Sequence, residues 1–194
     1  IAIKLQEAGL SDQVTREGIQ DLLERIKQLE SEGLQYEGAE ASFELLVRRT
    51  LPDYQPPFEL VDFTVVTKKS RHSVSQSNSD EMLTEATVQV RVNEDVTHTV
   101  AEGNGPVNAL DLALRRGLEQ AYPALQRVQL TDYKVRVVDQ GSGSTGAMVR
   151  VLVECTDGAR RWSTVGASTN VIEASWQALA DSMEYALVTL QDST

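Results

Sequence analysis

The string Glu102-Gly-Asn-Gly-Pro-Val107 is the part of this sequence that is best suited to binding a ligand. Gly103 and Gly105 free the backbone after a predicted strand, and Pro106 fits the first turn of a following helix. The backbone amides at such a helix start favour an anion such as a carboxylate. A tight strand-to-helix turn without a ligand is the alternative, and a glycine pair alone does not decide between the two.

A related turn precedes a second predicted helix and reads Val165-Gly-Ala-Ser-Thr-Asn170. Its polar residues are suited to capping that helix. A turn without a ligand is the alternative here too, but two related helix starts could face a shared cleft. Asp62 and Asp132 stand at equivalent strand positions, each before an aromatic residue. Either carboxylate could accept a hydrogen bond from a ligand ammonium, or it could simply face solvent.

The remaining reactive side chains indicate structural roles. His72 lies in a polar segment and is expected to be solvated, whereas His98 is expected to pack within a strand. Cys155 and Trp176 continue apolar faces and are expected in the core. The sequence has no nucleophile–base pair, no P-loop and no metal-binding motif. It therefore predicts a binding or assembly module without catalytic residues, metal ligands or a cofactor of its own.

Charge and cysteine content narrow the classes of function further. The 194 residues carry a formal net charge of −11, which argues against a nucleic acid or an anionic membrane as partner. A single cysteine excludes an internal disulfide and fits a reducing compartment, so we expect a cytoplasmic protein. The chain opens without Met or a targeting pattern, and we expect it to be a piece of a longer protein.

Helical periodicity marks the first part of the chain. Apolar spacing predicts helices over 15–33 and 38–50, with Thr15 as the N-cap and Gly33 as the stop of the first. We expect residues 1–51 to form a small helical linker subdomain that is too small to hold its own core. Three prolines then predict a stiff connector over 52–57.

From residue 58 onwards the same order of elements runs twice, and the two runs match at an offset of 65 residues in their third strands and their helices. Period-two and helical patterns predict strands over 61–65, 86–92 and 97–101 with a helix from Pro106, then strands over 130–138, 147–155 and 160–166 with a helix over 172–190. Residues 70–81 and 141–146 are predicted to be flexible loops.

The predicted fold class is therefore α+β, with duplicated βββα units. Each unit is a three-stranded antiparallel sheet with a helix, and the small helical linker subdomain precedes them. Residues 58–194 are expected to form one regulatory domain, with repeat one over 58–123 and repeat two over 124–194.

Four strings resemble one enzyme family, the isopropylmalate/citramalate synthases. Residues 31–46 are similar to the linker region of that family. Residues 98–111 look like the first signature of its C-terminal regulatory domain, and residues 132–137 and 162–179 look like the second. The resemblance covers nearly the whole chain and is closest to citramalate synthases.

The resemblance implies a LeuA-type regulatory and dimerising part of an acetyl-CoA-dependent 2-oxo acid condensing enzyme. The chemistry, with pyruvate as the 2-oxo acid in citramalate synthases, would belong to a TIM barrel that holds a divalent metal and that this chain lacks. This chain alone would then be inactive and would dimerise beside that barrel. It would bind isoleucine as a feedback inhibitor of isoleucine biosynthesis. The alternatives are the equivalent leucine-binding domain of 2-isopropylmalate synthase and a purely structural dimerisation module.

The same resemblance implies which residues bind the effector, and it leaves open whether the pocket lies within one chain or between two. They come from the two helix turns and one strand, namely Gly103, Asn104, Gly105, Val107, Ala109, Asp132, Tyr133, Gly166, Ala167, Ser168, Asn170 and Ile172.

Overall fold

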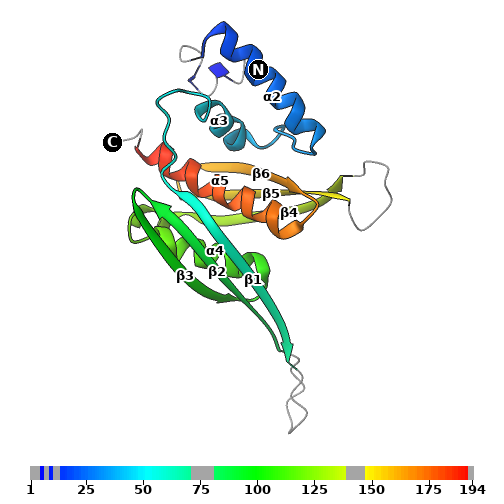
Figure 1. Cartoon of the computed structure of the whole chain (residues 1–194), viewed down its shortest axis with the longest axis vertical. Helices are drawn as coiled ribbons and strands as arrows, with labels where there is room; N and C mark the ends of the chain where they lie inside the picture. Colours follow the sequence, from blue (N-terminus) through cyan, green and yellow to red (C-terminus); the bar gives the residue numbers. More distant parts are fainter. Residues whose placement is uncertain (1–4, 7–8, 11–13, 71–80, 139–146, 192–194) are drawn as a thin grey trace. The chain divides into compact units, whose positions relative to one another are not determined.

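The computed structural model describes residues 5–6, 9–10, 14–70, 81–138 and 147–191. The chain forms two compact units, one from Pro57–Gln126 and the other from Ile1–Pro56 together with Arg127–Thr194 (Figure 1). The elements follow in the order α2 (Arg16–Ser31), α3 (Glu40–Arg48), β1 (Glu59–Ser70), β2 (Glu81–Val92), β3 (Asp95–Gly103), α4 (Pro106–Leu118), a 3-10 helix (Pro123–Arg127), β4 (Gln129–Val138), β5 (Met148–Thr156), β6 (Arg161–Ser168) and α5 (Val171–Gln191).

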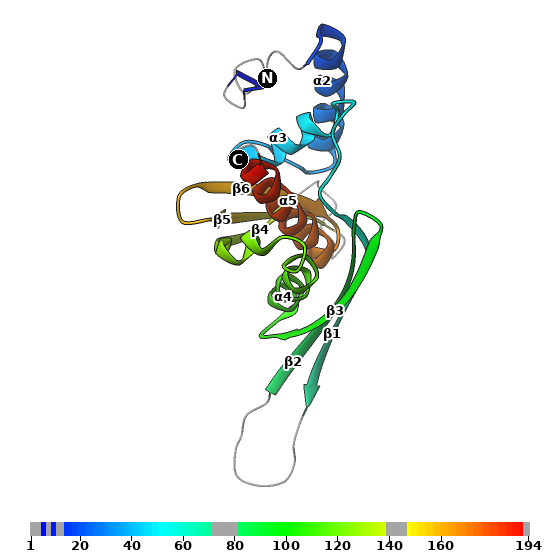
Figure 2. The same cartoon turned by 90° about the vertical axis from the view of Figure 1, so that its left-hand side faces the viewer.

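In the unit formed by Pro57–Gln126, α4 lies along one face of an antiparallel sheet with the strand order β1-β2-β3 (Figure 2). The middle strand turns Val88 and Val90 toward the helix, where both are fully buried. Leu110 and Leu114 form the facing stripe of α4 and are also fully buried. The apolar face of the strand, which uses every second residue, therefore packs against the apolar stripe of the helix, and this contact stabilises the unit.

The other unit has the same plan, with α5 across the antiparallel sheet β4-β5-β6 (Figure 1). Val151, Val153 and Cys155 of the middle strand are fully buried, as are Leu179 and Met183 of α5. Cys155 is a free thiol within this core. The predicted burial of Cys155 is therefore confirmed.

Equivalent bonds join strand to helix in the two units. The Thr99 hydroxyl donates to the carbonyl oxygen of Ala113 at 2.7 Å, and the Thr164 hydroxyl donates to that of Ala178 at 2.7 Å. Each first strand also shifts its register at the same place, before Asp62 in β1 and before Asp132 in β4. The predicted duplication of a βββα unit is confirmed.

Local signals in the helical segment act as predicted. Thr15 caps α2 by accepting a hydrogen bond from the amide of Gly18 at 3.1 Å. Gly33 follows the end of α2 with a φ of +97°, a conformation that glycine adopts without strain.

The helical segment packs against the sheet β4-β5-β6 through an apolar cluster. Leu22 and Ile26 of α2 and Phe43 and Val47 of α3 form this cluster together with Val165 of β6. The segment thus completes its core with a strand that lies more than a hundred positions later in the sequence.

A polar network also joins α3 to α5. Arg49, just after α3, contacts the carboxylates of Glu184 at 2.6 Å and Asp181 at 2.7 Å. Tyr54 donates to Glu184 at 2.6 Å, and Ser42 donates to Asp181 at 2.9 Å. Burial alone would lower the pKa of Arg49, but the hydrogen bonds and charges of the two carboxylates outweigh it and raise that pKa. The network is satisfied only while all its members are present.

The strands extend further than alternation predicted. β1 runs to Ser70 and β2 starts at Glu81, so the two ends of the predicted loop 70–81 are paired strand residues instead. Thr67, Lys68 and Lys69 are all exposed, which explains why no alternation marks this part of the strand. The rest of that loop, with His72, and the predicted loop 141–146 lie outside the described residues.

We expect Arg49→Ala to lower the free energy of unfolding by about 2 kcal/mol, because it leaves the buried Glu184 without its cation. The figure is below that of a fully buried pair because the Arg49 side chain is 40% exposed. Urea unfolding measures the change. The control is Arg161→Ala, which removes a cation that is 74% exposed and is expected to change stability by less than about 0.5 kcal/mol. Equal losses in the two variants would contradict the role given to the network.

Candidate functional site

The turn between β3 and α4 contains two glycines with different roles. A Cβ atom on Gly103 would lie 2.6 Å from the amide nitrogen and 2.9 Å from the Cα of Ala109, so strand and helix can approach this closely only with glycine there. A Cβ atom on Gly105 would meet nothing within 4 Å, and its φ of −178° suits any residue. The structure therefore requires Gly103 for packing, whereas Gly105 leaves open space at the helix start.

The start of α4 presents backbone amides that lack partners. Gly105 is the N-cap and offers no side chain, and Pro106 has no N–H. The amides of Val107 and Asn108 have no hydrogen-bond partner among the described residues. The Asn108 side chain folds back and accepts a hydrogen bond from the amide of Asn104 at 3.1 Å. Two open amides at the positive end of a helix can bind a carboxylate.

The equivalent turn before α5 caps itself. The Asn170 side chain accepts a hydrogen bond from the amide of Ile172 at 2.9 Å, and the Ser168 hydroxyl accepts one from the amide of Asn170 at 3.1 Å. The amide of Ala167 donates to the Gln177 side chain at 3.0 Å. These bonds occupy polar groups that the first turn leaves open.

Gly166 marks the close approach of strand and helix in this second turn. A Cβ atom there would lie 2.0 Å from the carbonyl oxygen of Ala174. Gly166 is therefore required for packing, and the same holds for the fully buried Ala109 in the first unit. Val107 and Ile172 are only half-buried, so a ligand can reach both side chains.

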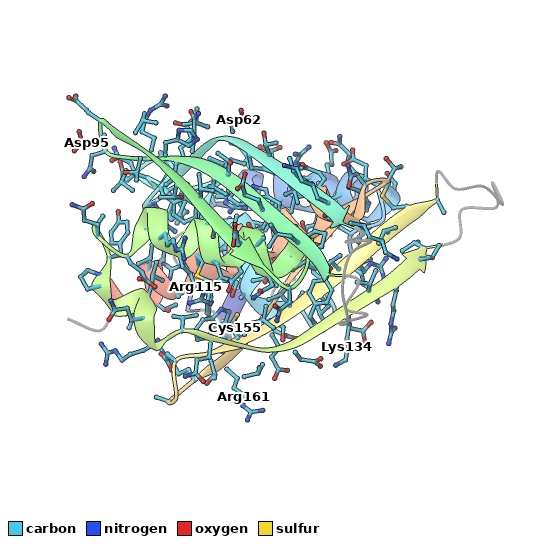
Figure 3. The ribbon with its side chains drawn as sticks, turned by 90° about the horizontal axis from the view of Figure 1, so that it is seen from below. Asp62, Asp95, Arg115, Lys134, Cys155 and Arg161 are labelled. Carbon is cyan, nitrogen blue, oxygen red and sulfur yellow. The ribbon has the colours of Figure 1, made fainter. Side chains whose placement is uncertain are left out.

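Asp132 and Tyr133 extend to opposite faces of the sheet, as consecutive strand residues do. The Tyr133 hydroxyl shares a hydrogen bond with Ser175, in the first turns of α5, at 2.7 Å. Asp132 pairs with Lys134, which projects from the outer side of the sheet, away from the side where Cys155 is buried (Figure 3). The Lys134 ammonium donates a hydrogen bond to Asp132 and thereby lowers the pKa of that carboxyl. Only Tyr133 of this pair lies beside α5.

The outer side of the sheet carries a cluster that the sequence patterns did not reveal. Lys134, Arg136 and Arg150 line a cavity of about 200 Å³ together with Gln35, Glu37 and Leu152. Only the pairing of β4 with β5 brings these cations together, since Arg136 stands directly opposite Arg150. The alternation Lys134-Val-Arg136 within one strand is the sole sequence signal for it.

Two further features of the described residues bear on function. No group of three or more His, Cys, Asp or Glu side chains among them is arranged to hold a metal ion. None of the helices in the described part of the chain is long and apolar enough to cross a membrane.

Comparison with known proteins gives a family match over most of the chain. Residues 37–187 match the family described as the LeuA allosteric (dimerisation) domain. The chain is 51% identical over 167 residues to an (R)-citramalate synthase of Geobacter sulfurreducens, covering 86% of this chain and 30% of that protein. It is 46% identical over 185 residues to an (R)-citramalate synthase of Aquifex aeolicus, covering 95% of this chain and 34% of that protein.

A 2-isopropylmalate synthase matches less of the chain. The protein of Shewanella amazonensis is 34% identical over 110 residues, which are 57% of this chain and 19% of that protein. The chain spans about a third of the length of the curated citramalate synthases that it matches.

The two glycines of the first turn are expected to respond differently to substitution. Gly103→Ala should lower the free energy of unfolding by about 2 kcal/mol, because the new methyl group meets helix backbone that cannot move aside. Gly105→Ala should change it by less than about 1 kcal/mol, the range of an altered N-cap. Urea unfolding of both variants is the measurement. If Gly105→Ala were the more damaging of the two, the assignment of Gly103 to packing would be wrong.

Proposed function

The chain belongs to the LeuA allosteric (dimerisation) domain family, and from this premise we propose that it is the feedback-regulatory and dimerising part of a citramalate synthase. The parent enzyme would condense acetyl-CoA with pyruvate in a catalytic barrel outside this chain. The chain itself would supply no catalytic residue, and its partners would be that barrel and a second copy of itself.

The proposed effector is isoleucine, with its carboxylate at the start of α4. The observation that carries this is the pair of unpartnered amides, Val107 and Asn108, in the open space beside Gly105. A carboxylate there gains two hydrogen bonds from backbone donors that are already fixed in position, and it meets the positive end of the helix. Val107 is half-buried next to these amides and offers apolar contact to the effector side chain.

The second turn is proposed to contribute through Ile172 and through the polar groups of Ala167, Ser168 and Asn170. Asn170 already occupies the Ile172 amide, which corresponds to the open Val107 amide of the first turn. Asp132 already pairs with Lys134 on the face of the sheet opposite to Tyr133. Tyr133, whose hydroxyl meets Ser175 near the start of α5, is the better placed polar group on that strand.

The energy available for choosing among branched amino acids is small. Burying about four methyl or methylene groups at ~0.8 kcal/mol each stabilises the complex by ~3 kcal/mol. One extra or missing methylene group changes discrimination in an apolar pocket by roughly tenfold where the effect is smallest. Valine, which is one methylene group smaller than isoleucine, is therefore expected to bind about tenfold more weakly. Leucine has the same number of carbons as isoleucine, so only the position of its branch can distinguish the two.

Inhibition is proposed to follow from a shift between two states. The effector must bind the inhibited state more tightly than the active one, since otherwise it shifts nothing. Within the unit that contains α5, the network of Arg49, Asp181 and Glu184 ties α3 to that helix. A displacement of α5 on effector binding would then move the linker with it, and the linker leads toward the rest of the parent protein.

Calorimetric titration of the chain with isoleucine, leucine and valine tests the proposal. We expect saturable binding with isoleucine the tightest. Leucine as the tightest ligand would assign the parent to 2-isopropylmalate synthesis, as the weaker Shewanella match would suggest. A well-folded dimer, verified by sedimentation, that binds none of the three would contradict the proposal and favour a structural dimerisation module.

Gly105→Asn is the sharpest variant, because it copies the cap that Asn170 provides in the second turn. The new side chain should cap α4 and raise the free energy of unfolding by a few tenths of a kcal/mol. It should also occupy the Val107 amide, as Asn170 occupies that of Ile172, and weaken isoleucine binding at least tenfold. A loss of binding together with a gain in stability cannot arise from misfolding. Unchanged affinity in a stabilised variant would show that the effector carboxylate binds elsewhere.

A further inference from the structure

The cavity on the outer side of the β4-β5-β6 sheet brings several positively charged side chains close together. Arg136 and Arg150 are direct partners across β4 and β5, and Lys134 lies two positions from Arg136 on the same face. Like charges at opposed positions in a sheet destabilise it. No ion pair among the described residues joins either arginine to a carboxylate. In a chain with a net charge of −11, this local excess of cations stands out.

The cavity holds Arg150 in a fixed position. Its Nε donates to the carbonyl oxygen of Gly33 at 2.7 Å, and its Nη1 donates to the Gln35 side chain at 2.5 Å. Burial and the charge of Arg136 lower the pKa of Arg150. Gly33 and Gln35, which lie between α2 and α3, therefore hold the Arg150 guanidinium without neutralising its charge.

We propose that this cavity is a binding site for a phosphate group, held by Arg136 and Arg150 with Lys134 at its rim. A guanidinium presents paired donors that match the oxygens of phosphate, and two of them facing each other across a strand pair suit its tetrahedral array of acceptors. A cavity of about 200 Å³ admits inorganic phosphate or a small phosphomonoester. Glu37 in the same wall limits the affinity by its negative charge.

The residues that line this cavity are not those proposed to hold the effector, and the two sets touch only where Lys134 pairs with Asp132. The cavity residues come from the outer side of the sheet and the α2–α3 connection, whereas the Tyr133 hydroxyl and α5 lie on the other side. The two sites can therefore be tested independently.

The experiment is calorimetric titration of the 194-residue chain with inorganic phosphate and with glycerol 3-phosphate, against chloride at the same ionic strength. We expect saturable phosphate binding that Arg136→Gln weakens at least tenfold. Glu37→Gln should tighten it about threefold, a gain that misfolding cannot produce. The matched control is Arg161→Gln, which removes a cation from the same outer side at the far end of the sheet and should leave binding unchanged (Figure 3).

Tighter binding of glycerol 3-phosphate would identify the ligand as a phosphomonoester, and equal or weaker binding would identify free phosphate. Both outcomes support the site. Absence of saturation, an unchanged isotherm in Arg136→Gln, or no gain in Glu37→Gln would overturn it. Arg136→Gln should bind isoleucine as the wild-type chain does. Loss of isoleucine binding in that variant would assign the cluster to the amino-acid site and overturn a separate phosphate site.

Discussion

The close approach of a strand end to a helix start is the constraint on which the rest of this structure depends. It occurs once in each unit, where Gly103 and Gly166 leave no room for a Cβ atom. The hydroxyls of Thr99 in β3 and Thr164 in β6 also hold strand and helix together, because they donate hydrogen bonds to carbonyl oxygens of α4 and α5. This contact sets the distance between the end of each third strand and the start of the helix that follows it.

The two units differ at this contact between strand and helix. In the first unit, Gly105 and Pro106 leave the amides of Val107 and Asn108 open. In the second, Asn170 fills the corresponding position with its own side chain. The start of α4 therefore has no side-chain cap, whereas Asn170 caps the Ile172 amide at the start of α5.

Local patterns were sufficient to predict the elements, because each depends on residues near in sequence. Thr15 caps the start of α2 and Gly33 follows its end, as predicted. The offset of 65 residues between matching positions revealed the duplicated fold. Two other features could not be predicted in this way. Arg49 meets Glu184 across 135 positions of sequence, so nothing local signals that the helical segment docks on α5. The facing of Arg136 and Arg150 depends on strand register, which the shift before Asp132 sets.

The sequence also could not separate the roles of neighbouring glycines. Gly103 and Gly105 look alike in the string, and only the position of Ala109 in space shows that the first is needed for packing. Asp132 and Tyr133 were likewise grouped together, although strand geometry sends them to opposite faces. Which side chains share a surface is a property of the folded sheet.

The most direct test of the central claim is amide nuclear magnetic resonance of the isotopically labelled chain during titration with isoleucine. If the start of α4 binds the effector carboxylate, the amide resonances of Val107 and Asn108 shift in a saturable manner, with the dissociation constant that calorimetry gives. Saturable binding that leaves both resonances unmoved, with shifts confined to other parts of the chain, would contradict the account.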